Sequence, residues 1–308
     1  MKCVLGFDGG GTKTECVAMD LAANVVARAR GPASNPTRVG FESAAAGVKQ
    51  VAEATIAAAK ESVEIAALCA GLAGTARPES HARMKQLLEE QFPGVAIDLR
   101  TDLDLPMAAI PEGPAIVLVV GTGSAAVGRD RAGRQLREGG YGPRGSDEGS
   151  AFDIGRAAVA AARKASNDEE SALSRQILRH LGCSNWQEVD ARSSGNADEV
   201  FPRVFPVVAA SADAGNSLAQ SLLNSAAMKL AHITSRLAHS LGIAAEPFPL
   251  AKTGGTIGRS QFFDLALDRA LAAMLPRAVL QPLLVDPAET AARLALRNIA
   301  RKEGAGPR

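Results

Sequence analysis

A glycine-rich turn near the start of the chain is the first feature that could do chemistry: residues 8–14 read Asp-Gly-Gly-Gly-Thr-Lys-Thr. Consecutive glycines tolerate positive φ angles and let an anion approach bare backbone N–H groups. Thr12 adds a hydroxyl donor and Lys13 adds a positive charge. Because one glycine would suffice for a hairpin, we interpret the turn as a phosphate-binding site. The residues expected to bind phosphate are Gly10, Gly11, Thr12 and Lys13.

Asp8 ends the apolar strand that leads into this turn, and we expect it to hold Mg²⁺ through water. The order of residues differs from that of a P-loop, which needs Gly-Lys-Ser or Gly-Lys-Thr followed by a helix. A dinucleotide-binding turn also opens a helix, whereas residues 15–20 have a strand pattern. The sequence therefore predicts a phosphate site between two strands.

Two further glycine turns follow predicted strands. Residues 121–124 read Gly-Thr-Gly-Ser after the strand 116–120, and residues 253–256 read Thr-Gly-Gly-Thr after the strand 248–251. Each could be an ordinary connection, but beside the first turn they predict a shared ligand. Two such loops can hold one polyphosphate, and the paired glycines of the third turn would let its backbone approach an adenine ring. The expected nucleotide-binding residues here are Gly121, Thr122, Gly123, Gly254 and Gly255.

Two carboxylates, Asp102 and Asp104, follow the predicted strand 95–99. In α/β proteins the carboxyl ends of strands point into the ligand crevice. Phosphoryl transfer to an alcohol needs a group that orients the hydroxyl and accepts its proton. Either aspartate could instead be the N-cap of the helix 105–110. We favour Asp102 as the catalytic base and Asp104 as the cap.

A second glycine-rich loop, residues 139–150, reads Gly-Gly-Tyr-Gly-Pro-Arg-Gly-Ser-Asp-Glu-Gly-Ser before a helix. Ser146 or Asp147 could cap that helix, but the glycine density exceeds what a cap requires. We therefore expect Tyr141, Gly142 and Asp147 to contact a substrate. Upstream, Asn35 could bind a sugar hydroxyl, but an Asx-turn is the simpler explanation of this residue.

Strands and helices alternate along the chain, which indicates an α/β class with largely parallel sheets. The opening strand-turn-strand pattern predicts an antiparallel edge, and a similar unit after Val120 predicts two related domains facing each other across a cleft. The length of 308 residues also favours two domains. We expect one domain at 1–110, with a helix at about 288–303 packing back on it, and the other at 111–287. The polar residues 183–198 show no clear element.

The composition argues against several classes of function. A formal net charge of +1 and 4% aromatic residues offer no surface typical of nucleic-acid or anionic membrane binding. The four cysteines contain no C-x-x-C pair, so neither disulfides nor a zinc site is expected. Apolar stretches end before the roughly 18 residues of a membrane span, and no signal peptide is recognised. We expect a cytoplasmic protein.

Taken in order, residues 8–14, 101–102, 121–124 and 139–150 resemble the family shared by N-acetylglucosamine kinase, bacterial glucosamine kinase and the BadF/BadG/BcrA/BcrD ATPases. The resemblance runs from the first strand to about the last helix. It implies two actin-like domains of the ribonuclease H type, with mixed sheets flanked by helices and with ATP and Mg²⁺ in the cleft. It also implies transfer of the γ-phosphoryl group to the 6-hydroxyl of an amino sugar, N-acetyl-D-glucosamine or alternatively glucosamine.

Residue by residue, the resemblance implies that Thr12 and Thr122 contact phosphates and that Asp102 is the base for the 6-hydroxyl. Gly254 and Gly255 would lie near the adenosine. The sugar pocket would be lined by Asn35, Tyr141, Gly142 and Asp147. Many relatives carry Trp at position 141 and Gly at position 146, so the sugar's N-substituent stays open. Relatives also suggest a homodimer.

Two other activities fit the resemblance less well. ATPases that activate acyl-CoA dehydratases or reductases share an iron–sulfur cluster between subunits, which needs closely placed cysteine ligands. None of the four cysteines offers a suitable pair. Sugar-sensing repressors carry a DNA-binding module ahead of the fold, whereas the first strand is expected to begin at Lys2. A BadF-type ATPase with a non-sugar partner stays as the alternative to an amino-sugar kinase.

Overall fold

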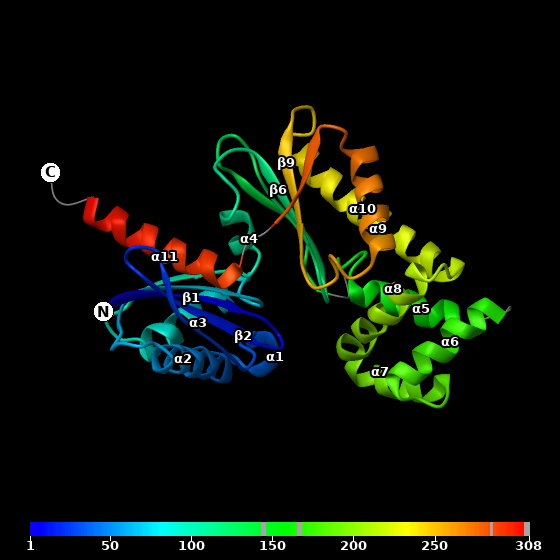
Figure 1. Ribbon diagram of the computed structural model, residues 1–308, viewed down its shortest axis with the longest axis horizontal. Coiled ribbons are helices and arrows are strands. Elements are labelled where there is room, and N and C mark those ends of the chain that lie inside the picture. Colours follow the sequence, from blue (N-terminus) through cyan, green and yellow to red (C-terminus); the bar gives the residue numbers. More distant parts are fainter. Residues whose placement is uncertain (143–145, 165–167, 284–285, 305–308) are drawn as a thin grey trace. The chain divides into compact units, whose positions relative to one another are not determined.

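The structure is a computed structural model, which describes residues 1–142, 146–164, 168–283 and 286–304 (Figure 1). Internal contacts divide the chain into two units. Unit 1 is formed by Met1–Pro111 together with Leu284–Arg308, and unit 2 by Glu112–Leu283. Each unit is built around its own five-stranded sheet.

The sheet of unit 1 has the strand order β3-β2-β1-β4-β5. Its first three strands are antiparallel hairpins, whereas β1, β4 and β5 run parallel. The central strand β1 is buried continuously from Cys3 to Phe7, as expected where helices cover both faces. The strands are β1 (Lys2–Gly9), β2 (Thr14–Asp20), β3 (Val25–Gly31), β4 (Glu64–Leu72) and β5 (Ala96–Arg100).

Helices cover both faces of this sheet. One face packs against α2 and α3 and the opposite face against α11 and α4 (Figure 1). On β1, a Cβ atom built at Gly6 would lie 2.1 Å from the backbone nitrogen of Ala292, so α11 lies directly on the strand backbone. The helices of unit 1 are α1 (Pro36–Val39), α2 (Phe41–Ala57), α3 (Pro78–Gln91), α4 (Asp104–Ala108) and α11 (Pro287–Gly304).

The sheet of unit 2 has the strand order β10-β9-β6-β7-β8. It repeats the plan of unit 1: two antiparallel hairpin pairs, then parallel strands on the other side of the first strand. The repeated order confirms the predicted α/β fold of two related halves with mixed sheets. The strands are β6 (Ala115–Val120), β7 (Ser124–Arg129), β8 (Gln135–Gly139), β9 (Phe248–Thr253) and β10 (Ala278–Pro282).

A larger set of helices shares one hydrophobic core with this second sheet. The long helix α9 packs along β6, β7 and β8, and α10 lies beside α9 (Figure 1). Side-chain oxygens cap these helices, since Asn216 accepts a hydrogen bond from the N–H of Ala219 and Ser260 from that of Phe263. The helices are α5 (Ala151–Ala162), α6 (Asp168–Leu181), α7 (Trp186–Val200), η1 (Phe201–Val204), α8 (Phe205–Asp213), α9 (Ser217–Ser240) and α10 (Gln261–Met274).

One segment differs from the sequence-based expectation, because the polar residues 183–198 contain most of α7. This helix begins at an Asn185 N-cap, whose side chain accepts from the N–H of Glu188, and is kinked at Asn196. Of its residues only Val189 and Val200 are buried. With so small an apolar face, hydrophobic periodicity could not reveal the helix.

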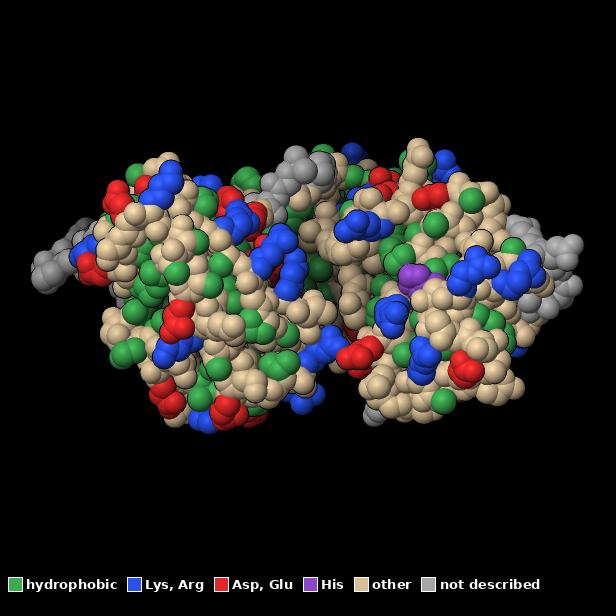
Figure 2. All heavy atoms as spheres, turned by 60° about the horizontal axis from the view of Figure 1, so that its bottom comes forward, with side chains coloured by type: hydrophobic (Ala, Val, Ile, Leu, Met, Phe, Trp, Pro, Cys, Tyr) green, Lys and Arg blue, Asp and Glu red, His purple; other side chains and the backbone are tan. Residues whose placement is uncertain are grey.

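The exposed side chains carry mixed charge. On the face drawn in Figure 2, Lys and Arg side chains are interspersed with Asp and Glu over both units, in keeping with the net charge of +1. In the part of the chain that the structure describes, no helix has both the length and the hydropathy needed to cross a bilayer.

Candidate active site

The first glycine turn joins β1 to β2 in unit 1. The N–H of Gly10 donates to the carbonyl of Lys13 at 2.9 Å, which closes the turn. The carbonyl of Gly10 in turn accepts from the N–H groups of Ser34 and Asn35, each at 3.2 Å. Thr14 adds a bond from its hydroxyl to the Ser34 hydroxyl at 2.8 Å. The connection after β3 is therefore fastened to the phosphate turn, and it brings Asn35 beside it.

Lys13 is engaged with its own strand. Its Nζ atom lies 2.5 Å from Oε1 of Glu15, which is also 3.0 Å from Nε of Arg30. The Glu15 side chain is only 12% exposed, so Lys13 and Arg30 neutralise a carboxylate that is largely shielded from water. A phosphate would compete with Glu15 for Lys13. The phosphate-binding role of Lys13 stays a prediction.

Asp8 stands at the end of β1 in a strongly negative environment. Burial, together with the nearby charges of Asp102, Glu15 and Asp286, raises the pKa of its carboxyl to about 6, although Lys13 opposes the shift. A cation at this position would be favoured, which fits the predicted Mg²⁺. Among the residues that the structure describes, no three His, Cys, Asp or Glu side chains lie close enough to hold a metal by themselves. Mg²⁺ commonly binds one or two carboxylates, water and substrate phosphates, so the single carboxylate of Asp8 fits such a site.

The two carboxylates after β5 have different surroundings. Asp104 accepts hydrogen bonds at its Oδ2 atom from the N–H and the hydroxyl of Thr101, both at 2.9 Å. The predicted cap is wrong in this respect: α4 begins at Asp104 itself, and its N-cap, Leu103, has no side-chain bond. The carboxylate of Asp104 turns back toward the strand instead. Asp102, by contrast, is close enough to Asp8 for its charge to raise the pKa of Asp8.

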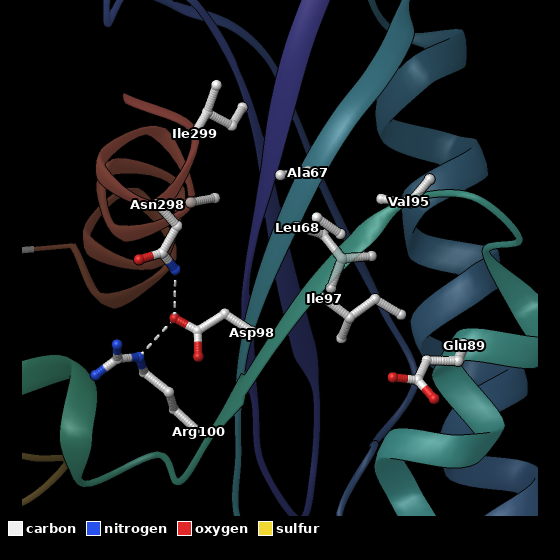
Figure 3. Close-up of a pocket in the computed structure, with 11 residues that line it drawn as sticks. Ala67, Leu68, Glu89, Val95, Ile97, Asp98, Arg100, Asn298 and Ile299 are labelled. Atoms are coloured by element: carbon white, nitrogen blue, oxygen red, sulfur yellow. Dashed lines mark hydrogen bonds and ion pairs between the residues drawn. The ribbon is translucent and has the colours of Figure 1, made fainter. Parts of the chain in front are cut away.

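A hydrogen bond connects β5, the strand that leads to Asp102, to the helix α11 (Figure 3). Asp98 on β5 accepts from Nδ2 of Asn298 on α11 at 2.8 Å and from Nε of Arg100 at 2.9 Å. These groups border a hollow of about 620 Å³ that follows β5 between α3 and α11. None of the predicted site residues lines this hollow. Its polar groups tie α11 to the strand before Asp102.

Asn35 is the N-cap of α1, as the Asx-turn interpretation predicted. Its Oδ1 atom accepts from the N–H of Thr37 at 2.9 Å and from the Thr37 hydroxyl at 2.7 Å. Gly74, with φ +83°, follows β4 and lies against the same oxygen. The cap uses the amide oxygen, so the Nδ2 group is the part of Asn35 that could serve a sugar hydroxyl.

The second turn, between β6 and β7, is held by the start of α5. The N–H of Gly121 donates to the carbonyl of Gly123 at 2.8 Å. Two amides at the start of α5, those of Ala151 and Phe152, donate to the carbonyls of Gly121 and Thr122 at 2.9 and 3.2 Å. The first N–H groups of a helix have no partner inside it and give it a positive end. Unit 2 therefore places such a helix end beside its glycine turn.

The side chain of Asp147, from the loop 139–150, contacts this second turn. Its Oδ1 atom accepts from the N–H of Ser124 at 3.4 Å, and a Cβ atom built on Gly123 would lie 3.0 Å from both carboxylate oxygens. Burial raises the pKa of the Asp147 carboxyl, although the Ser124 N–H opposes the shift. The structure thus brings together the Gly-Thr-Gly-Ser turn and one residue predicted for the substrate.

Tyr141 is exposed on the loop 139–150 and lies beside a cationic side chain. Its ring is stacked by the guanidinium of Arg137, 4.2 Å from the ring centroid, and its N–H donates to the hydroxyl of Ser146 at 2.7 Å. Gly142 follows with φ +99°, a conformation that favours glycine. Residues 143–145, also part of the predicted glycine loop, lie outside the described residues.

The third turn, after β9, contacts the second one. Gly254 has φ +113°, and a Cβ atom there would lie 2.3 Å from the carbonyl oxygen of Val120. Thr256 donates to that oxygen from its N–H at 3.1 Å and from its hydroxyl at 2.8 Å. A Cβ atom on Gly121 would lie 3.7 Å from the nitrogen of Gly255. Within unit 2 the residues predicted for phosphate and for adenosine are therefore adjacent.

Asp153 positions this region and was missed from the sequence. It is only 6% exposed, and its carboxylate accepts from the N–H of Gly149 at 3.0 Å, from Lys229 at 2.7 Å and from Arg156 at 2.9 Å. Burial raises its pKa, but these partners more than offset the effect and the pKa is lowered. The spacing Ser150-x-x-Asp153, resembling a capping box, was the available signal.

Comparison with known proteins places these features in a family. Residues 5–281 match the sequence profile of the BadF/BadG/BcrA/BcrD ATPase family. An N-acetyl-D-glucosamine kinase of Dictyostelium discoideum is 27% identical, over 96% of this chain and 98% of the relative. An N-acetylmuramic acid/N-acetylglucosamine kinase of Clostridium acetobutylicum is 26% identical, over 85% of this chain and 88% of the relative.

A solved structure from Chromobacterium violaceum, described as a candidate N-acetylglucosamine kinase, has the same fold. It superposes with a TM-score of 0.77 at 25% identity and covers 96% of this chain and 99% of its own. The match extends over both units of the chain.

Proposed function

The chain belongs to the BadF/BadG/BcrA/BcrD ATPase family, and we propose that it is an ATP-dependent kinase that phosphorylates N-acetyl-D-glucosamine. The observation that carries the proposal lies in unit 1, where the glycine turn, Asp8 and Asp102 all lie at or just after the same end of the parallel strands β1 and β5. In this proposal the turn binds a phosphate, and the carboxylates bind a metal ion and orient the acceptor alcohol. The kinase names of two relatives that match most of the chain support the choice of sugar.

The nucleotide phosphates are assigned to the backbone N–H groups and hydroxyls of the turns. In this proposal Gly10, Gly11 and Thr12 serve from unit 1, and Gly121, Thr122 and Gly123 from unit 2. Gly254 and Gly255 accept the adenosine. Preorganised donors of this kind stabilise the charge that spreads over the transferred phosphoryl oxygens. Mg²⁺ held near Asp8 would supply further positive charge to the β- and γ-phosphates.

Asp102 is proposed to act on the acceptor. It orients the sugar's 6-hydroxyl and takes its proton while the oxygen forms a bond to the γ-phosphorus. The bond between that phosphorus and the oxygen bridging to the β-phosphate breaks, and ADP leaves. Asn35, Tyr141, Gly142 and Asp147 are proposed to bind the sugar. A positioned base of this kind contributes roughly 10²–10⁴-fold to the rate.

A substrate panel tests the proposal directly. ADP release is measured with N-acetylglucosamine, glucosamine, N-acetylmuramic acid, N-acetylmannosamine and glucose, and we expect N-acetylglucosamine to give the highest kcat/KM. 6-Deoxy-N-acetylglucosamine should give no turnover, since it lacks the proposed acceptor. ADP release without any sugar dependence would indicate a family ATPase with another partner and would refute the kinase proposal.

The role of Asp102 is tested against its neighbour. Asp102→Asn should lower kcat by roughly 10²–10⁴-fold while calorimetry shows ATP and sugar still binding. The matched control is Asp104→Asn, because Asp104 is tied to Thr101 and an amide can still accept those bonds. Should Asp104→Asn lose more activity than Asp102→Asn, the assignment of the base is wrong.

Three broader expectations accompany the kinase proposal. We propose that residues 1–110 with 288–303 and residues 111–287 are two actin-like domains, and the division of internal contacts supports these bounds. We also propose a homodimer that works in the cytoplasm, as the family resemblance implies. Light scattering on purified protein tests the dimer, and fractionation of the source cells tests the compartment.

A further inference from the structure

Arg38 lies against the phosphate turn of unit 1, although no motif in the sequence pointed to it. It belongs to the short helix α1. A Cβ atom built on Gly11 would lie 2.8 Å from Cδ of Arg38 and 2.8 Å from its Nη1 atom. The guanidinium group is therefore in contact with the backbone of a residue that is proposed to bind phosphate.

The chain between the turn and Arg38 is short and firmly held. The carbonyl of Gly10 accepts from the N–H groups of Ser34 and Asn35 at 3.2 Å. Asn35 then caps α1 through Thr37, and its carbonyl accepts from the N–H of Arg38 at 3.0 Å. A continuous series of hydrogen bonds thus runs from the turn to the backbone of Arg38. The arginine's place over Gly11 follows from the local fold.

Lys13, the basic residue inside the turn, is less suited to the phosphate. Its ammonium group lies 2.5 Å from the carboxylate of Glu15, whose side chain is 12% exposed. Binding a phosphate through Lys13 would draw the lysine away from Glu15 and leave that carboxylate to Arg30, whose Nε atom lies 3.0 Å from it. Lys13 is thus shared with the strand pair, whereas Arg38 lies directly against Gly11.

We propose that Arg38 binds the terminal phosphate of the nucleotide at Gly11 and is the main basic side chain that unit 1 supplies to it. This inference rests on the proposed function in taking the nucleotide to be ATP. A guanidinium can bind two phosphate oxygens at once through charge-assisted hydrogen bonds. An oxygen held by the N–H groups around Gly11 would lie within reach of Nη1. Arg38 thereby distinguishes a nucleoside triphosphate from a diphosphate.

The test compares binding of MgATP and MgADP by calorimetry, together with kcat and KM for ATP. Arg38→Ala should weaken MgATP binding by roughly 10- to 100-fold, as expected for loss of a charge-assisted bond, and MgADP binding much less. Arg38→Lys should recover part of the affinity. Lys13→Ala should lose less affinity for MgATP than Arg38→Ala does, and Arg83→Ala should stay within about fivefold of the wild type, since its exposed ion pair contributes little. Arg83 is the matched arginine control, because it pairs with Glu42 on the surface of unit 1.

Several results would overturn the assignment. An unchanged affinity of Arg38→Ala for MgATP, or equal losses for MgATP and MgADP, would remove Arg38 from the terminal phosphate. A greater loss in Lys13→Ala would return that role to the lysine. If Arg38→Ala does not fold, Arg38→Met keeps the stem of the side chain and the same comparison decides.

The binding readout also separates this inference from the kinase proposal. A wild-type protein that binds MgATP but phosphorylates no sugar defeats the kinase proposal alone, and the variants still decide the role of Arg38. A wild-type protein that does not bind MgATP refutes the assignment of Arg38 as well.

Discussion

Replacing Asp8 by Asn should make the protein without ligands more stable and the enzyme less active. The carboxylate of Asp8 is shielded by burial and repelled by Asp102, Glu15 and Asp286, which raises its pKa from 3.8 to about 6. A shift of about two pKa units corresponds to about 3 kcal/mol at about 1.4 kcal/mol per unit. Above pH 6 the folded state bears this cost, and an uncharged amide of the same size removes most of it.

The sign of the effect depends on pH. The folded state binds its proton more tightly than the unfolded state, so ionising Asp8 destabilises the fold as pH rises from about 4 to about 6. Asp8→Asn should therefore match the wild type near pH 4. Above pH 6 it should gain about 2 to 3 kcal/mol, or about 5 to 10 °C in Tm for the transition that includes unit 1.

Differential scanning calorimetry between pH 4 and pH 8, without nucleotide or Mg²⁺, measures this difference. Asp20→Asn is the matched control of opposite sign, because hydrogen bonds from the side chain and backbone of Asn24 lower the pKa of Asp20. That control should lose stability above the ordinary pKa of aspartate. A stability difference between Asp8→Asn and the wild type that does not change with pH, or a less stable variant at pH 8, would refute the reasoning.

The same variant links the stability of the site to its function. In Asp8→Asn, the Mg²⁺ concentration that gives half of the maximal kinase rate should rise, because the proposed Mg²⁺ loses its carboxylate. A variant that is more stable but less active would show that the turn tolerates an unfavourable charge for the sake of the metal. Unchanged Mg²⁺ dependence would remove Asp8 from the metal site.

Three other substitutions, the first with a control of its own, test the packing of unit 1 and the residues around the proposed sites. Gly6→Ala should lower the free energy of unfolding by about 3 kcal/mol or more, since a methyl group would overlap the backbone of α11, whereas Gly195→Ala in α7 meets nothing and should be neutral or stabilising in urea titrations. Gly254→Ala, at φ +113° and against a β6 carbonyl, should raise KM for ATP more than KM for the sugar, and equal changes would contradict its place near the adenosine. Asp153→Asn should raise KM for the sugar. Because the folded pKa of Asp153 is lowered, its carboxylate stabilises the wild type above the ordinary aspartate pKa, and this contribution should vanish in acid. A variant with unchanged KM, and with the same dependence of stability on pH in acid as the wild type, would count against this role.

Sequence patterns predicted the elements whose signal is local. The buried run before Asp8 and the glycines after it predicted the strand and turn of unit 1, because a strand covered on both faces must be almost wholly apolar. The same reasoning found β6 and its turn. Two such units predicted the duplicated fold, which the strand orders of the two sheets confirm.

What sequence patterns missed depends on contacts far apart in the chain. Arg38 lies over Gly11 only because the connection after β3 folds back on the turn. Thr101 donates its hydrogen bonds to Asp104, and the spacing alone does not reveal which of the two carboxylates, Asp102 or Asp104, accepts them. The short edge strand β10 was also overlooked, because five residues beside a helix carry too weak an alternation to be recognised.

The packing of α11 on unit 1 has a consequence for how the protein is made. This helix covers the face of the sheet formed by Val4, Val17 and Met19, yet it follows residues 112–283 in the chain. At about 5 to 20 residues per second, a ribosome needs about 10 to 30 seconds to make that intervening segment. During this time one apolar face of the sheet of unit 1 is not yet covered by α11, while unit 2 can already fold. A ribosome stalled before residue 286 would therefore present unit 1 with this apolar face exposed, a kind of surface that promotes aggregation.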